Sequence, residues 1–235
     1  GGEAGAVGLV AQSGNMALEL GRFLARDQLG FSRFASLGNQ ADLTAADLIR
    51  SCTEHDGTEL IALYCEDFGD GRAFAHAAAD AVRAGKPVVL LTVGAGPASM
   101  RGARSHTGAL TSDSAVIDAA CRAAGIDRVA TVAELAHLLG ALHRNRRGGG
   151  RRLAVIADGG GHASLASDVA EAHGLRVPEF DDRLVAGLKA ELPPSAGTAN
   201  PVDLAGAGEQ DITSFGRVLD LALGAESVDS VLVTG

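Results

Sequence analysis

The sequence is poor in several residue types, and each shortage argues against a class of protein. Only 20 of its 235 residues are Lys or Arg, against 29 Asp and Glu, which gives a formal net charge of −9. This balance argues against nucleic acid as a partner, because phosphate backbones are bound by basic surfaces. No apolar run approaches the roughly 20 residues of a membrane-spanning helix, and no signal peptide opens the chain, so we expect no membrane partner.

Cysteine is also scarce. The three cysteines, Cys52, Cys65 and Cys121, form neither a C-x-x-C pair nor an even disulfide framework. Unpaired, buried thiols are typical of the reducing cytoplasm, where we expect this protein to act.

Several catalytic motifs are missing as well. The chain has no G-x-x-x-x-G-K-[ST] loop, and Gly94-Ala95-Gly96 lacks the third glycine of a dinucleotide fingerprint. No His, Cys or carboxylate spacing resembles a zinc site, and no G-x-S-x-G elbow marks a hydrolase. The sequence therefore predicts no bound metal and no direct P-loop binding of a nucleotide.

What remains is the composition of a globular α/β protein, with 46% hydrophobic residues, 32 glycines and only 3% aromatics. Apolar runs alternate with amphipathic segments, a pattern that predicts parallel strands connected by helices. We expect strands at 6–11, 31–37, 60–65 and 86–92, and helices from about 16, at 44–52, 72–83, 112–124 and 134–143.

The pattern restarts after a charged, Gly-rich stretch, 144–152, which is interpreted as a solvated hinge, with a phosphate-binding patch as the alternative. A strand at 153–157, a Gly-rich turn and a helix at 163–172 follow, and a strand at 228–235 ends the chain. We therefore expect two domains of related design with doubly wound parallel sheets, 1–146 and 147–235, the second incomplete. The chain opens almost directly on a strand and closes on another, so we expect it to be a piece of a larger protein.

Each domain has a glycine-bearing turn between its first strand and first helix. The first turn is Gln12-Ser13-Gly14-Asn15, and the second includes Gly159, Gly160, Gly161 and His162. Unpaired N–H groups at a helix N-terminus bind anions, although capping by Ser13 or Asn15 explains the first turn equally well. Two such helix ends aimed at a common point would bind a phosphate.

The stretch Ser105-His106-Thr107-Gly108 places one imidazole among small residues. Neutral imidazole is a nucleophile near pH 7 and a candidate phosphoryl carrier, although a solvated or capping histidine is the alternative. Such a carrier needs a carboxylate on its other ring nitrogen. Glu66, at the end of the strand 60–65, is a candidate, and the alternatives for Glu66 and Asp67 are metal ligands or solvated loop acids.

These stretches, taken in order, resemble the NDP-forming acyl-CoA synthetases, relatives of succinyl-CoA synthetase. The resemblance is carried by 8–14 (GLVAQSG), 36–42 (SLGNQAD), 63–66 (LYCE), 86–89 (KPVV) and 105–110 (SHTGAL), and it continues at 159–161 (GGG) and 200–203 (NPVD). It implies two consecutive flavodoxin-like ligase domains.

The resemblance also implies a mechanism. His106 would take the phosphoryl group of an acyl phosphate, and its loop, supported by Ser105, Thr107 and Gly108, would carry that group to ADP. Glu66 would be the carboxylate partner of His106, and the turns 12–15 and 159–162 would hold the phosphate. CoA and ATP or ADP with Mg²⁺ would be bound mainly by a CoA-binding domain and an ATP-grasp domain, in cis or in trans, within a homo- or hetero-oligomer.

Three positions depart from the family pattern: Asn15, His162 and Thr92, the last where acetate-type enzymes often have Lys. They bear on the choice of acid substrate more than on the phosphohistidine step. A different class of function is a ligand-sensing, ligase-like module of a protein acetyltransferase. Such a sensor has no need of the histidine, so the intact stretch around His106 favours the enzyme.

Overall fold

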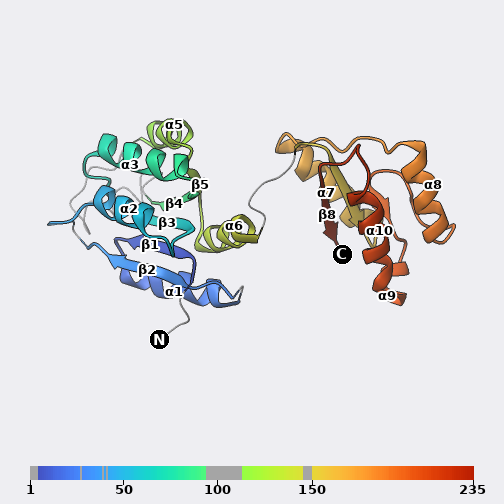
Figure 1. Ribbon diagram of the computed structural model, residues 1–235, viewed down its shortest axis with the longest axis horizontal. Helices are drawn as coiled ribbons and strands as arrows, with labels where there is room; N and C mark the ends of the chain where they lie inside the picture. Colours follow the sequence, from blue (N-terminus) through green and yellow to red (C-terminus); the bar gives the residue numbers. More distant parts are fainter. Residues whose placement is uncertain (1–4, 27, 39, 41, 94–112, 145–149) are drawn as a thin grey trace. The chain divides into compact units, whose positions relative to one another are not determined.

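A computed structural model of the chain describes residues 5–26, 28–38, 40, 42–93, 113–144 and 150–235. The chain folds into two compact units, Gly1–Arg146 and Arg147–Gly235. Each unit has one parallel sheet with helices packed on it (Figure 1). The α/β class and the parallel sheets predicted from the alternating pattern are confirmed.

The sheet of the first unit has five strands in the order β2-β1-β3-β4-β5, and every neighbouring pair is parallel. This is the flavodoxin-like order, in which the direction of winding switches between β1 and β3. The strands are β1 (Val7–Ala11), β2 (Phe31–Ser36), β3 (Leu60–Cys65), β4 (Val88–Thr92) and β5 (Asp127–Val129).

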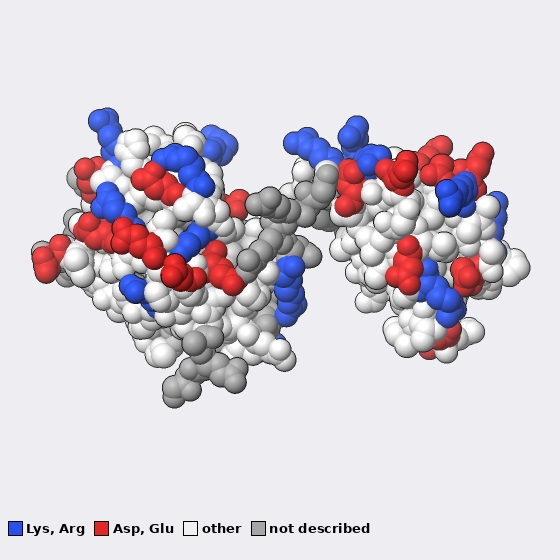
Figure 2. All heavy atoms as spheres, in the orientation of Figure 1, with Lys and Arg blue, Asp and Glu red and all other residues white. Residues whose placement is uncertain are grey.

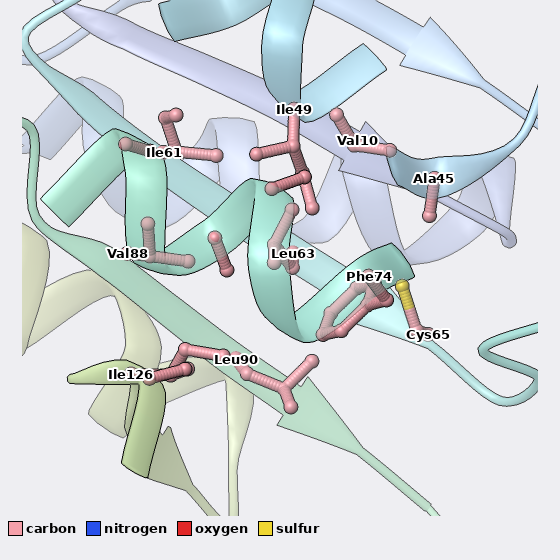
Figure 3. Close-up of a cluster of buried hydrophobic side chains, with 14 of the residues drawn as sticks. Val10, Ala45, Ile49, Ile61, Leu63, Cys65, Phe74, Val88, Leu90 and Ile126 are labelled. Carbon is pink, nitrogen blue, oxygen red and sulfur yellow. The ribbon is translucent and has the colours of Figure 1, made fainter. Parts of the chain in front are cut away.

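Helices cover both faces of this sheet, so its central strands are buried on both sides. Helices α2 (Ala45–Glu54), α3 (Gly71–Arg83) and α5 (Ser114–Ala124) pack on one face through a cluster that includes Ile49, Leu63 and Phe74 (Figure 3). Helices α1 (Gly14–Arg26) and α6 (Val132–Arg144) pack on the other face, around residues such as Leu9 and Leu139. Burial on both faces explains the unbroken apolar runs of β1, β3 and β4.

Side-chain caps begin several of these helices. Thr44 and Asp47 form a reciprocal capping box at α2, Asp70 accepts two main-chain N–H bonds at α3, and Asp113 accepts one at α5. These caps satisfy N–H groups that have no partner within the helix.

The register aligns the carboxyl ends of the first four strands. Ala11 pairs with Ser36 on β2 and with Tyr64 on β3, and Cys65 pairs with Thr92 on β4. The turns that follow these strands therefore emerge at one edge of the sheet, where ligands bind in open α/β folds.

The second unit has a parallel sheet of three strands, in the order β7-β6-β8. These strands are β6 (Leu153–Ala157), β7 (Val202–Asp203) and β8 (Ser230–Thr234), and the helices are α7 (Gly160–Ala172), α8 (Asp182–Glu191), α9 (Ala207–Gln210) and α10 (Thr213–Leu223). Helix α7 packs on β6 through Val155 and Ala170, whereas α8 and α10 bury Leu188 and Val218 in a separate cluster.

The structure corrects several boundaries. The helix expected at 163–172 begins at Gly160, so Gly160, Gly161 and His162 form its first turn and are not part of the preceding turn. The strand expected at 86–92 begins at Val88, since Pro87 has no N–H for strand pairing. Helix α5 begins at Ser114, later than the expected residue 112. Strands β5 and β7 and helices α8, α9 and α10 are not foreseen by the sequence pattern.

Charges of both signs are mixed on the surface. Figure 2 shows Lys and Arg side chains interspersed with Asp and Glu on the visible face of each unit. None of the helices in the described ranges is both long and apolar enough to cross a membrane.

Candidate functional site

The candidate site is centred on the carboxyl ends of the paired strands β1 and β3, where Gln12 links the two turns that follow. The Gln12 main-chain N–H donates to Tyr64 O at 3.0 Å. Its side-chain Oε1 accepts hydrogen bonds from the N–H groups of Glu66 at 2.6 Å and Asp67 at 2.9 Å, and its Nε2 donates to Asp67 O at 2.5 Å. The Gln12 side chain thus continues the pairing of β1 with β3 beyond the last strand residue.

A second glutamine reaches the same turn. Gln40 Nε2 donates to Asp67 O at 2.8 Å, and Gln40 Oε1 accepts from Ala45 N, at the start of α2, at 2.9 Å. Gln40 has a left-handed φ of 53°, uncommon for a residue with a side chain. The turns after β1, β2 and β3 are therefore joined at the Asp67 carbonyl.

Glu66 lies at the first position after β3 and is half-buried. Its Oε1 accepts a hydrogen bond of 2.9 Å from the hydroxyl of Tyr64. Tyr64 itself is only 7% exposed, and burial, helped by the hydrogen bond to Glu66, raises the pKa of its phenol well above the usual range. The hydroxyl therefore stays protonated and acts as the donor.

The N-terminus of α1 lies directly after Gln12. Ser13 Oγ accepts a long hydrogen bond of 3.4 Å from Met16 N, and Ser13 O accepts from Ala17 N at 3.3 Å. Ser13 thus has the capping role that the sequence allowed. Within the described ranges the N–H groups of Gly14 and Asn15 have no hydrogen-bond partner, and both residues are exposed, so this helix end can also accept an anion.

His106, Ser105, Thr107 and Gly108 lie outside the described residues. The residues on either side of the segment that contains them belong to the sheet and to α5. The chain leaves the sheet after Thr92, which pairs with Cys65 immediately before Glu66, and it is described again from Asp113, the cap of α5. The segment thus starts one strand away from Glu66.

The corresponding edge of the second unit has its own helix end. Gly159 caps α7 without a side-chain hydrogen bond. Of the residues described, none accepts a hydrogen bond from the N–H groups of Gly160, Gly161 or His162, and all three residues are exposed. A hollow of about 730 Å³ opens here, bordered by residues that include Asp158, His162 and Thr234.

Asp158, directly after β6, has a structural role at this edge. Its two carboxylate oxygens accept hydrogen bonds from Gly208 N at 3.0 Å and Glu209 N at 2.8 Å, at the start of α9. In the part of the chain that the structure describes, no group of His, Cys, Asp and Glu side chains is arranged to hold a metal ion.

Sequence reasoning missed two residues of the first edge, Tyr64 and Gln40. Tyr64 and Glu66 are two positions apart, and this spacing on a strand places side chains on the same face. That signal was available in the sequence. The role of Gln40 was not, since it depends on the meeting of three turns in the folded chain.

Residues 4–142 match the family model of the succinyl-CoA ligase like flavodoxin domain, which is more than half of the chain. The chain is 32% identical over 230 residues to the ADP-forming acetate–CoA ligase I of Archaeoglobus fulgidus, covering 98% of this chain and 33% of the relative. It is 30% identical over 231 residues to the ADP-forming 4-hydroxybutyrate–CoA ligase of Nitrosopumilus maritimus, covering 98% and 33%.

A relative that is itself a subunit, the ADP-forming acetate–CoA ligase II subunit alpha of Pyrococcus furiosus, is 32% identical over 200 residues, which are 85% of this chain and 43% of that subunit. Among solved structures, the dinucleotide forming acetyl-coenzyme A synthetase 1 of Ca. Korarchaeum cryptofilum, in complex with phosphate and ADP, superposes with a TM-score of 0.88 at 29% identity. That match covers 98% of this chain and 49% of the other.

The chain thus spans about a third of the length of the ligases of Archaeoglobus fulgidus and Nitrosopumilus maritimus and about half of the solved synthetase. The resemblance expected from the sequence is confirmed by the family model and by the relatives, and the solved synthetase shares the fold of this chain. This chain belongs to the succinyl-CoA ligase-like flavodoxin domain family.

Proposed function

We propose that this chain is part of an NDP-forming acid–CoA ligase that works through a phosphohistidine at His106. Phosphate attacks the acyl-CoA carbonyl, CoA leaves as the thiol, and an acyl phosphate forms. An imidazole nitrogen of His106 then attacks the phosphorus, and the carboxylic acid leaves. The phosphohistidine finally passes the phosphoryl group to an NDP, which becomes an NTP. The named ligases among the relatives support this reaction class.

The observation that carries the proposal is the position of Glu66. A phosphoryl-accepting imidazole needs one free nitrogen as the nucleophile and a carboxylate that accepts the N–H of the other nitrogen. Glu66 follows β3, and the segment that contains His106 begins after the adjacent strand β4. A carboxylate beside the origin of this segment suits the role of orienting partner.

The phosphate would be held by main-chain N–H groups. Gly14 and Asn15 at α1 and Gly160, Gly161 and His162 at α7 are exposed. In our proposal each of these helix ends contributes to phosphate binding, with about half a positive charge and free donors. Ser13 would keep α1 capped, and Gln12 would tie this turn to Glu66. The two units would then be consecutive ligase domains, 1–146 and 147–235.

The reaction would also require domains that bind CoA and the nucleotide. A CoA-binding domain and an ATP-grasp domain, in cis or in trans, would bind CoA and the nucleotide with its Mg²⁺, in a homo- or hetero-oligomer. We place the reaction in the cytoplasm, where the unpaired thiols of Cys52, Cys65 and Cys121, all buried, are compatible with a reducing environment.

The proposal is tested by phosphoryl labelling of the complete ligase. Incubation with γ-labelled ATP and Mg²⁺ should give an acid-labile, base-stable phosphoprotein, and addition of the acid substrate and CoA should remove the label and yield acyl-CoA. The variant His106→Ala should lose both the label and the synthesis. The matched control is His76→Ala, an exposed histidine on α3, which packs on the face of the sheet opposite α1; this variant should keep both. Full labelling of His106→Ala would overturn the assignment.

A further inference from the structure

We propose that Tyr64 is a positioning residue for Glu66: its hydroxyl fixes one carboxylate oxygen, so that the other oxygen is presented to the imidazole. This inference rests on the proposed function, since it assigns Tyr64 a part in the orientation of the phosphoryl carrier. Tyr64 is the only tyrosine of the chain.

The end of β3 brings the side chains of Tyr64 and Glu66 together. Tyr64 and Glu66 are two residues apart at the end of β3, so their side chains leave the strand on the same face. The Tyr64 hydroxyl lies 2.9 Å from Glu66 Oε1. Among the described residues, Tyr64 is the one whose side chain hydrogen-bonds to this carboxylate.

In the hydrogen bond between the two side chains, the Tyr64 hydroxyl is the donor and Glu66 is the acceptor. The Tyr64 ring is buried with Leu9, Leu91 and other apolar residues, and a buried phenol needs a partner for its O–H. Burial raises the pKa of this phenol, so the hydroxyl keeps its proton. A hydroxyl that donates to a carboxylate forms a charge-assisted hydrogen bond, which is stronger than one between neutral groups.

Gln12 holds the main chain at Glu66 in place. The Glu66 N–H is held by Gln12 Oε1 at 2.6 Å, and the next N–H, that of Asp67, by the same oxygen at 2.9 Å. The backbone of Glu66 is thus anchored, but three rotatable bonds separate it from the carboxylate. Tyr64 removes this remaining freedom, which would otherwise have to be lost in each catalytic cycle.

Tyr64 also fills the core, and the two roles are separable. The ring makes the apolar contacts, whereas only the hydroxyl reaches Glu66. The variant Tyr64→Phe removes the hydrogen bond and keeps the ring. If Tyr64 serves packing alone, this variant should phosphorylate the histidine at nearly the wild-type rate.

The test is a double-mutant cycle on the complete ligase, with wild type, Tyr64→Phe, Glu66→Gln and the double variant. The measurement is the single-turnover rate of histidine phosphorylation, with KM for acid and CoA. A hydrogen bond to a charged group predicts that Tyr64→Phe slows phosphorylation about 10-fold, with KM nearly unchanged. In the Glu66→Gln background the same change should cost less than about twofold, because the carboxylate that it positions is gone.

The matched control is Cys65→Ala. Cys65, the last residue of β3, lies between Tyr64 and Glu66 in the sequence, but its side chain is buried in the cluster on the opposite face. This variant perturbs the same strand end without touching Glu66, so its phosphorylation rate should stay close to that of wild type. Thermal unfolding of all variants checks that the fold is kept.

Two results overturn the inference while leaving the proposed function intact. In the first, the wild type is labelled and Tyr64→Phe is phosphorylated at the wild-type rate. In the second, Tyr64→Phe lowers the phosphorylation rate equally in the wild-type and Glu66→Gln backgrounds. A wild-type enzyme that takes no label on His106 overturns the proposed function, and the inference with it. The two failures are therefore distinguishable.

Discussion

Gln12 and Glu66 are joined across the switch point of the first sheet by a hydrogen bond of 2.6 Å between the Gln12 side-chain oxygen and the Glu66 main-chain nitrogen. The same carboxamide also binds both main-chain groups of Asp67. Gln12 lies at the turn that begins α1, so one side chain couples the candidate phosphate site to the candidate carboxylate. Its N–H and its side chain both have protein partners, which favours a positioning role for Gln12 over direct contact with phosphate.

The variant Gln12→Ala should therefore destabilise the first unit. It leaves the N–H groups of Glu66 and Asp67 without their acceptor, and a poorly solvated donor without a partner costs about 1–3 kcal/mol. Urea unfolding of the chain measures this loss. The matched control is Asn15→Ala, an exposed residue three positions away, which should stay within about 0.5 kcal/mol of wild type. Equal stability of Gln12→Ala and wild type would contradict the bridging role.

Gly8 on β1 should not tolerate a side chain. A Cβ at this position would lie 2.8 Å from Cys52 Sγ and 3.0 Å from Thr58 Cγ2, both in the buried interior. We expect Gly8→Ala to cost about 1–3 kcal/mol by overpacking. Gly14→Ala is the matched comparison, because a Cβ there meets no atom within 4 Å, and this variant should be neutral or stabilising by up to about 1 kcal/mol. Denaturant midpoints that rank the two variants in the opposite order would refute the packing argument.

The second unit contains an ion pair whose contribution to stability depends on pH. Arg152 binds Asp229 through its guanidinium, at 2.6 Å, and through its main-chain N–H, at 2.8 Å. The guanidinium hydrogen bond, followed by the main-chain bond, lowers the pKa of Asp229 to about 2. A carboxyl whose pKa is lower in the folded state stabilises the fold above the unfolded-state pKa, near 4, and loses that contribution as pH falls towards 2.

We therefore expect Asp229→Asn to lower the unfolding midpoint at pH 6, and the difference from wild type to shrink steadily between pH 4 and pH 2. Thermal melts across this range measure the difference. The control is Asp168→Asn on α7, an exposed carboxylate with no resolved interaction with Arg152, for which the difference should stay small at every pH. A gap for Asp229→Asn that is constant from pH 6 to pH 2 would argue against the ion pair.

The thiol of Cys65 should be unreactive in the folded chain. Burial raises its pKa to about 12, so the thiol stays protonated at pH 8, and the sulfur is shielded from solvent. Alkylation by iodoacetamide at pH 8, mapped by mass spectrometry, should spare Cys65 until the chain is unfolded in urea. Rapid modification of Cys65 in the native protein would show that the end of β3 opens readily.

The fold class and the central strands were predictable because their signals are local. Strands β1, β3 and β6 are buried on both faces and read as unbroken apolar runs. Strand β5 has three residues, Asp127, Arg128 and Val129, and becomes a strand only by pairing with β4. No periodicity could predict it, because its partner lies more than thirty residues earlier in the chain.

The candidate site, too, was predictable from the sequence only in part. Ser13 was open to two interpretations, and the structure supports the cap while leaving the N–H groups of Gly14 and Asn15 exposed. Gln12 was expected to bind phosphate, and that stays a prediction; in the structure its side chain bonds to the turn after β3. A sequence does not say which of many possible partners a carboxamide will meet, because that depends on the register of two parallel strands.

The sequence by itself determined the alternation of strands and helices, the two Gly-bearing turns and the family, because hydrophobic periodicity and ordered motifs are local properties. Only the tertiary structure decided that Tyr64 donates to Glu66 and that Gln12 and Gln40 converge on Asp67. These contacts depend on a register that pairs Ala11 with Tyr64 and on three turns meeting at one edge of the sheet. That register is set by the packing of buried side chains on both faces, which no single segment of the chain encodes.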